Sequence, residues 1–140
     1  MNILNSKILK HEVYQKTLNS TVLFNGVGIH SGKVVNMKLI PARENTGIVF
    51  KRIDLDENNL IKVNVNNIEK TKFCSKLINK YGVSISTVEH LLATLHALDI
   101  NNLLIEIDAP ELPAMDGSSY EFTYKLIQIG SKIQQKPYVC

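Results

Sequence analysis

Ser86-Thr87-Val88-Glu89-His90-Leu91-Leu92-Ala93 opens the clearest helix in this sequence, and the other elements are assigned around that helix. Apolar residues recur through it at the i, i+3, i+4, i+7 spacing of an amphipathic helix, at Val88, Leu91, Leu92, Leu95 and Leu98. The spacing predicts a helix over residues 87–98 whose leucine stripe packs on a sheet. The same stretch sets a carboxylate and an imidazole side by side at the start of that helix.

Most of the remaining chain has the pattern of β-strands. Apolar segments bounded by turn residues predict strands over residues 17–24, 34–40, 48–53, 61–65, 71–78, 83–85 and 103–107, with a glycine-punctuated turn at 26–33. A second helix is expected over residues 119–129, because Ser118 and Glu121 form a capping box and Gly130 suits the C-terminal end. Together the elements predict an α+β fold, a two-layer sandwich in which two helices cover one face of a mixed β-sheet.

The composition is typical of a soluble globular protein and argues against a nucleic-acid-binding protein. A chain of 140 residues with 44% hydrophobic and 21% charged residues is expected to form one domain with a modest core. The net charge of +3 is spread along the chain, with no run of five basic residues, which argues against nucleic-acid binding. The chain has only five Tyr, four Phe and no Trp, which also argues against a surface on which nucleic-acid bases stack.

Cysteine content and hydropathy indicate the compartment. Cys74 and Cys140 form neither a disulfide framework nor a paired metal motif, so a reducing environment is the default. The sequence has no apolar stretch of signal-peptide length and no run of 18 apolar residues, so no transmembrane segment is predicted. We therefore expect a cytoplasmic protein. Residues 1–13 have the composition of a flexible leader.

Glu89 and His90 each have two interpretations. Ser86 and Glu89 stand at the spacing of a capping box, in which the glutamate side chain folds back to the Ser86 backbone N–H and has a structural role only. A single histidine is likewise more often a satisfied surface or core residue than a metal ligand. However, the first turn of a helix disfavours imidazolium, and a neutral imidazole is what a metal ligand requires. The residues alone leave both interpretations open.

The helix side opposite the leucine stripe carries His90, Ala93 and Ala97, at 100° per residue. A solvent-facing side normally carries Lys, Glu or Gln, so small apolar residues there indicate that something packs closely over it. Since the leucines already need the sheet, the expected cover is another domain or another chain. His96 lies far round the helix from His90 and is expected to be a bystander.

Five stretches together resemble the UDP-3-O-acyl-N-acetylglucosamine deacetylase family, which comprises zinc enzymes of lipid A biosynthesis. They occur in the family's order and spacing, and the resemblance covers residues 14–130. The stretches are Gln15-Lys16-Thr17-Leu18, Gly26-Val27-Gly28-Ile29-His30-Ser31-Gly32, Pro41-Ala42-Arg43-Glu44-Asn45-Thr46-Gly47-Ile48, Ser86-Thr87-Val88-Glu89-His90-Leu91-Leu92-Ala93-Thr94-Leu95 and Pro110-Glu111-Leu112-Pro113-Ala114-Met115-Asp116-Gly117-Ser118-Ser119.

The resemblance implies a zinc-dependent amide hydrolysis that removes the N-acetyl group of UDP-3-O-acyl-N-acetylglucosamine. His90 would be one of three protein ligands to Zn²⁺, and Glu89 would be the general base that activates the zinc-bound water. Catalytic zinc sites of this kind keep three protein ligands and one open position.

Four further residues acquire candidate roles through the same resemblance. Phe73 and Cys74 match a segment that lines the cleft near the substrate, and His30 matches a residue close to the metal. Asp116 matches a position linked to the site, although its type and place fit a turn and N-cap residue equally well.

The resemblance also implies that the complete enzyme has a second, similar domain, which supplies the other two zinc ligands. In this interpretation residues 14–132 form the first domain, and residues 133–140 begin a linker towards an absent second domain. The chain would then be inactive alone and would need a second-domain fragment in trans. The alternative is a non-catalytic remnant or binding module of the same fold.

Overall fold

The computed structural model describes residues 14–64, 68–70, 75–115 and 120–137. In chain order the elements are β1 (Tyr14–Leu18), β2 (Val22–Gly28), β3 (Val34–Pro41), β4 (Ile48–Arg52), β5 (Leu60–Lys62), β6 (Ile68–Lys70), β7 (Ser75–Ile78), β8 (Ser84–Ser86), α2 (Glu89–Ala97), β9 (Leu103–Ile107), β10 (Pro113–Ala114), α3 (Tyr120–Ile129) and β11 (Ser131–Pro137). Neither described helix is long and apolar enough to cross a membrane.

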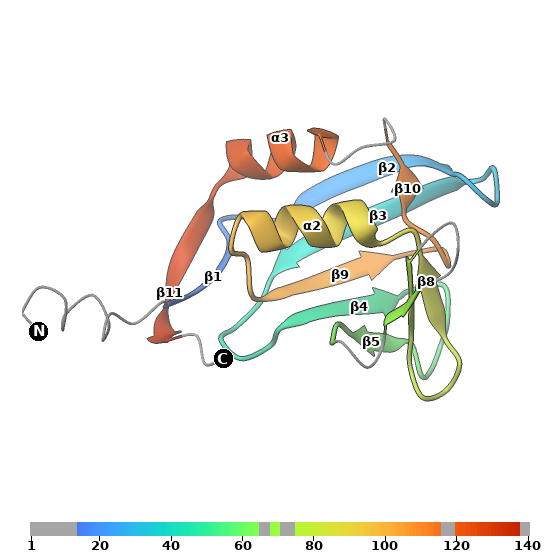
Figure 1. Ribbon diagram of the computed structural model, residues 1–140, viewed down its shortest axis with the longest axis horizontal. Coiled ribbons are helices and arrows are strands. Elements are labelled where there is room, and N and C mark those ends of the chain that lie inside the picture. Colours follow the sequence, from blue (N-terminus) through green and yellow to red (C-terminus); the bar gives the residue numbers. More distant parts are fainter. Residues whose placement is uncertain (1–13, 65–67, 71–74, 116–119, 138–140) are drawn as a thin grey trace, which may run out of the picture.

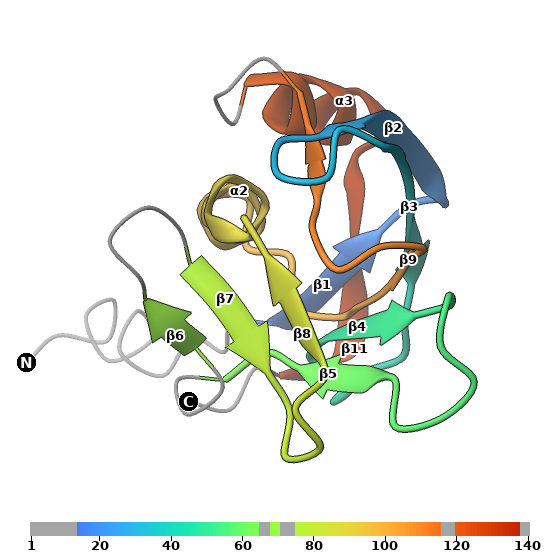
Figure 2. The same ribbon diagram turned by 90° about the vertical axis from the view of Figure 1, so that its right-hand side faces the viewer.

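The main sheet has six strands in the order β10-β2-β3-β9-β4-β5. Its β4–β9 pair is parallel and its other pairs are antiparallel, so the sheet is mixed. Two smaller sheets, β1-β11 and β6-β7-β8, complete the fold. Both helices lie on one side of the curved main sheet, and β7 and β8 pass close to the start of α2 (Figures 1 and 2). The predicted α+β sandwich is confirmed.

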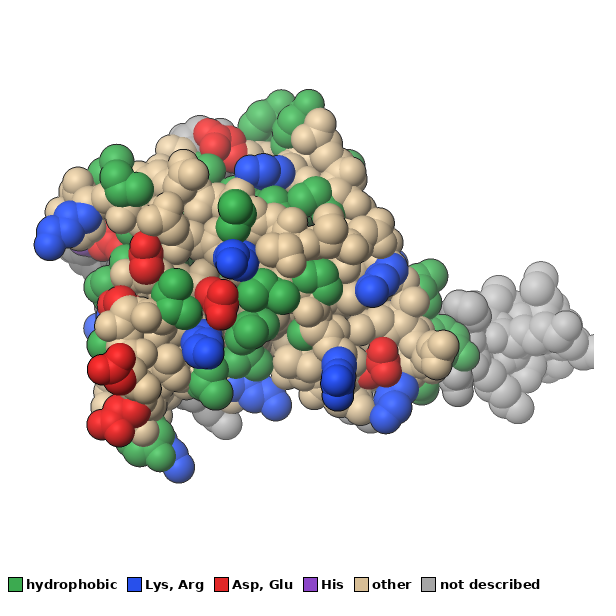
Figure 3. Space-filling model, turned by 180° about the vertical axis from the view of Figure 1, so that it is seen from behind, with side chains coloured by type: hydrophobic (Ala, Val, Ile, Leu, Met, Phe, Trp, Pro, Cys, Tyr) green, Lys and Arg blue, Asp and Glu red, His purple; other side chains and the backbone are tan. Residues whose placement is uncertain are grey.

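The two faces of the main sheet differ as the alternation of the sequence predicts. Along β3, Val35, Met37 and Leu39 are buried while their neighbours Val34, Asn36 and Lys38 are exposed. The opposite, uncovered face carries acidic and basic side chains scattered among hydrophobic ones (Figure 3). Neither sign of charge gathers into a continuous patch on that face, consistent with the even charge distribution of the sequence.

The helices close the core over the covered face. Leu91 and Leu95 of α2 and Phe122 and Leu126 of α3 are at most 3% exposed. The rings of Phe24 in β2 and Phe122 meet edge to face with centroids 5.0 Å apart, a favoured aromatic geometry. The leucine stripe of α2 therefore has the partner that its spacing predicted.

The strand predicted over residues 17–24 is in fact two strands, because the chain breaks at Asn19. Its backbone N–H donates to the Gly130 carbonyl at 3.0 Å, and its side-chain amide donates to the Ile129 carbonyl at 3.2 Å. Asn19 thus satisfies carbonyls that the end of α3 leaves free. Gly130 adopts φ 77°, so the predicted glycine cap of this helix is confirmed.

A buried network of side-chain amides joins β1 and β11 to the main sheet. The Asn102 side-chain amide donates to Gln15 Oε1 at 2.9 Å and to Gln134 Oε1 at 2.7 Å. Asn102 Oδ1 accepts the Gly47 N–H at 2.8 Å, and Gln15 Oε1 also accepts the Asn45 N–H at 2.7 Å. Asn102, Gln15 and Gln134 are at most 9% exposed, so the network is part of the interior.

The domain boundary expected at residue 132 falls inside β11. Residues 133–137, expected as linker, belong to β11, which pairs antiparallel with β1. The polar sequence of β11 hid this strand, since its one buried side chain is the amide of Gln134. The leader expected over residues 1–13 lies outside the described residues.

Candidate active site

The chain enters α2 through an unusual backbone conformation at Thr87. Its φ is 60°, in the left-handed region where a β-branched residue is a genuine outlier. The Thr87 N–H donates to the Ser75 carbonyl at 3.0 Å, and its hydroxyl donates to the Ser86 carbonyl at 2.6 Å. Such strain costs about 1–3 kcal/mol and concentrates at functional sites. The conformation turns the chain sharply between β8 and α2.

This turn removes the capping-box interpretation of Glu89. The helix N-cap is Val88, with φ −89° and ψ −11°, and no side chain caps it. The Ser86 N–H, which a capping box would give to Glu89, donates instead to the Pro110 carbonyl at 2.8 Å. Glu89 Oε2 accepts the Ser75 N–H at 3.3 Å. The carboxylate is therefore directed towards the start of β7, and the predicted capping box is absent.

His90 follows on the exposed side of α2. His90, Ala93 and Ala97 are all exposed, while Val88 and Leu91 are buried. The assignment of helix faces made from the sequence is confirmed. His96, in the last turn, is exposed as well. The site therefore presents an imidazole on an open surface, with a half-buried carboxylate at the preceding residue.

A second loop lies against the same turn. Glu111 forms a parallel bridge with Ser86, and the Leu112 N–H donates to the Ser86 carbonyl at 3.1 Å. The Glu111 side chain accepts the His30 N–H at 3.0 Å and the Ser31 N–H at 3.4 Å, both at Oε1. Segments that are far apart in the sequence thus meet at one end of the sandwich. The structure brings the backbone of His30 to the end that carries Glu89, with the imidazole of His30 exposed.

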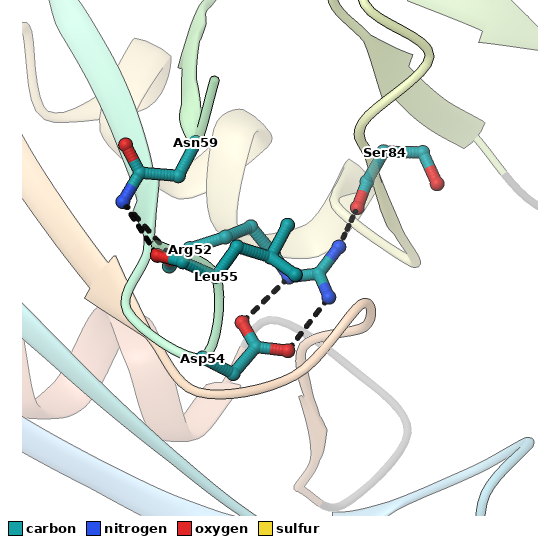
Figure 4. Close-up of polar contacts among 5 residues, drawn as sticks. All are labelled: Arg52, Asp54, Leu55, Asn59 and Ser84. Atoms are coloured by element: carbon teal, nitrogen blue, oxygen red, sulfur yellow. Dashed lines mark hydrogen bonds and ion pairs between the residues drawn. The ribbon is translucent and has the colours of Figure 1, made fainter. Parts of the chain in front are cut away.

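Arg52 anchors β8, and thereby the start of α2, to the main sheet (Figure 4). Its Nη1 donates to the Ser84 carbonyl at 3.0 Å, while Nε and Nη2 donate to the two carboxylate oxygens of Asp54 at 2.9 and 2.7 Å. The Asn59 side-chain amide donates to the carbonyls of Arg52 and Leu55, both at 3.1 Å, and closes the loop. Bidentate pairs of this kind fix orientation as well as adding energy.

The Arg52–Asp54 pair predicts a dependence of stability on pH. The hydrogen bond from Arg52 is the main cause that holds the pKa of Asp54 below its usual value of 3.8, against the opposing effect of burial. The pair therefore stabilises the fold fully above pH 3.8, and its contribution is lost as pH falls through the lower folded pKa.

We expect Asp54→Asn to lower the free energy of unfolding by about 1–3 kcal/mol at pH 6. The difference from the unmodified chain should shrink as pH falls below about 4. Urea unfolding between pH 3 and 6 measures it. A difference that is constant over this range would show that the carboxylate charge is not what holds Arg52.

The described residues contain no group of three His, Cys, Asp or Glu side chains that could hold a metal ion. What the described residues do provide is a carboxylate and an imidazole at adjacent positions, with a hydrogen bond from Ser75 of β7 to the carboxylate. This arrangement can supply a general base beside one imidazole ligand, but the described residues do not complete a metal centre.

The sequence profile of the family described as LpxC, UDP-3-O-acyl N-acetylglycosamine deacetylase, matches residues 15–140. This chain belongs to the LpxC family. The curated UDP-3-O-acyl-N-acetylglucosamine deacetylase of Haemophilus influenzae (strain PittEE) is 46% identical over 122 residues, which are 87% of this chain and 40% of that relative. The relative of the same name from Pasteurella multocida (strain Pm70) is 45% identical over 122 residues, again 87% of this chain and 40% of the relative. The one from Actinobacillus pleuropneumoniae serotype 3 (strain JL03) is 44% identical over 125 residues, 89% of this chain and 41% of the relative.

The resemblance inferred from the five motifs is thus confirmed. This LpxC-family chain spans about 40% of the length of the curated relatives that it matches, and the match is to their N-terminal part.

Three of the predicted site residues of this LpxC-family chain, Phe73, Cys74 and Asp116, lie outside the described residues. Ser75, which follows Cys74 in the chain, donates to Glu89, so the described part of β7 begins beside the carboxylate.

Sequence reasoning gave no role to Glu111 or to the Arg52–Asp54 pair. An acidic residue between Pro110 and Leu112, in a segment that is otherwise apolar, is the one local signal for a buried carboxylate.

Proposed function

We propose that this chain provides the Glu89–His90 part of a zinc-dependent deacetylase site that acts on UDP-3-O-acyl-N-acetylglucosamine, a step of lipid A biosynthesis. Membership of the LpxC family and the deacetylase activity for which the relatives are named support the substrate and reaction class. The observation that carries the proposal is the orientation of Glu89. Its carboxylate is free of the capping role and is held by one hydrogen bond at the first turn of α2.

In this reaction water attacks the carbonyl of the N-acetyl group, the C–N bond breaks, and acetate and a free amine are released. Glu89 is the group that accepts a proton from the attacking water, because it is a carboxylate adjacent to the proposed metal ligand. When bound, zinc makes water more acidic and polarises the carbonyl. His90 would donate one imidazole nitrogen to the zinc, and its exposure leaves that nitrogen accessible.

The remaining zinc ligands come, in this proposal, from residues beyond those described. The absence of a three-ligand group in the described ranges and the 40% coverage of the relatives support this. A second-domain fragment supplied in trans, such as the part of the Haemophilus influenzae relative that follows its matched region, would complete the site over the side of α2 that carries His90, Ala93 and Ala97. A cytoplasmic location remains our expectation.

We expect the 140-residue chain alone to bind zinc weakly and to release no acetate, because one imidazole cannot replace a three-ligand site. Calorimetry with zinc and mass spectrometry of the substrate measure both quantities. In the complex with the second-domain fragment, His90→Ala should remove zinc and turnover together.

His96→Ala is the matched control, since His96 is exposed on the same helix. It should leave zinc content and turnover unchanged. Tight stoichiometric zinc with turnover in the chain alone would contradict the proposal. A completed complex that binds substrate without hydrolysing it would favour the non-catalytic binding module instead.

A further inference from the structure

Glu111 is a buried acid that the proposed reaction does not use. It is 4% exposed, and it forms no ion pair with any residue of the described ranges. A carboxylate is costly to bury without partners. Its neighbours Leu112 and Pro113 are buried apolar residues, so filling space at this position would not need an acid. The carboxylate is therefore at this position because it accepts hydrogen bonds from the groups around it.

Those donors belong to the turn between β2 and β3. Glu111 Oε1 accepts the backbone N–H groups of His30 and Ser31 at 3.0 and 3.4 Å. The approach is so close that a side chain on Gly28 would have to displace the carboxylate. A Cβ there would overlap Glu111 Oε1 and would lie 2.7 Å from its Cδ and 2.8 Å from Ser31 Oγ. The glycine at this position thus leaves the space that the carboxylate occupies.

The backbone of Glu111 is fixed to the other side of the site. It bridges Ser86, whose N–H and carbonyl are bonded to the residues on either side of Glu111, Pro110 and Leu112. Ser86 stands three residues before Glu89. The 110–112 segment therefore holds the residues before α2 through the backbones of Pro110 and Leu112, while the Glu111 side chain holds the His30 turn.

We infer that Glu111 is a positioning residue that holds the His30 turn against the start of α2, and so sets where His30 lies relative to Glu89 and His90. The effect on turnover rests on the proposed function of Glu89 and His90, whereas the effect on the turn does not. Glu111 acts through the backbone of His30 and touches no reacting atom in this assignment.

The first arm of the test measures the turn in the ¹⁵N-labelled 140-residue chain. Glu111→Met keeps the volume and removes the acceptor, and it should accelerate hydrogen exchange of the His30 and Ser31 amides about tenfold or more. Glu111→Gln keeps an acceptor oxygen and should restore most of the protection. Gln134→Met removes a buried acceptor in the distant amide network, and it should lower the melting temperature without changing these two amides.

If Glu111→Met does not fold, Gly28→Ala replaces it. The added Cβ drives the carboxylate away from the two amides and should produce the same faster exchange. Unchanged exchange at His30 and Ser31 in the folded variant would overturn the inference.

The second arm measures turnover in the complex with the second-domain fragment. Glu111→Met should lower kcat about tenfold with zinc content and KM unchanged, and Glu111→Gln should recover it. Faster amide exchange with unchanged kcat would show that Glu111 is only structural, which also overturns the inference. If the unmodified complex releases no acetate, the proposed function fails, and the amide measurement alone then decides whether Glu111 holds the turn.

Discussion

Glu89→Gln should lower kcat of the completed enzyme by about 10²–10⁴-fold while zinc content stays the same. The reason is that glutamine keeps an oxygen to accept the Ser75 N–H but cannot accept a proton from water. The structure of α2 should therefore survive the change. Rates under saturating substrate and zinc by atomic absorption measure the two quantities.

Glu121→Gln is the matched control, because Glu121 is an exposed glutamate in the first turn of α3. This variant should have a kcat within twofold of that of the unmodified enzyme, even if the lost charge weakens the interaction with the dipole of α3. A lower melting temperature with an intact kcat in Glu89→Gln would mean that Glu89 stabilises the fold and that another group is the base.

Asn102→Leu should lower the free energy of unfolding by about 2–6 kcal/mol, the largest stability effect that we expect in this chain. The change leaves the Gly47 N–H and Gln134 Oε1 without their partner, and each orphaned buried group costs about 1–3 kcal/mol. A domain of this size is stable by only about 5–15 kcal/mol, so the variant should be close to unfolding. Urea unfolding followed by circular dichroism measures the loss.

Asn25→Ala serves as the comparison, since Asn25 is an exposed residue of β2 whose side chain makes no hydrogen bond to the described residues. It should change stability by no more than about 0.5 kcal/mol. A loss below 1 kcal/mol in Asn102→Leu would show that water replaces the missing groups and that the network is not part of the core.

Elements with strong periodicity could be predicted from the sequence. The leucine stripe of α2 and the alternation of β3 are local patterns that report directly which face is buried. The exposed position of His90 followed from the same geometry. These predictions succeed because each depends on residues within one element.

The missed features depend on contacts between distant segments. Asn19 breaks a strand because it caps a helix more than a hundred residues later. Glu89 does not cap its helix because Pro110 takes the Ser86 N–H and because Thr87 adopts a left-handed backbone. β11 has one buried residue, an amide, so its sequence carries no hydrophobic signal. Only the folded chain shows which of these local possibilities is realised.

The pairing of β1 with β11 fixes the place of the last described strand in the fold. These strands lie at one end of the molecule, and the start of α2 beside β8 lies at the other (Figure 1). A group attached beyond β11 therefore starts at the end of the molecule opposite the start of α2. A purification tag attached there would leave Glu89 accessible.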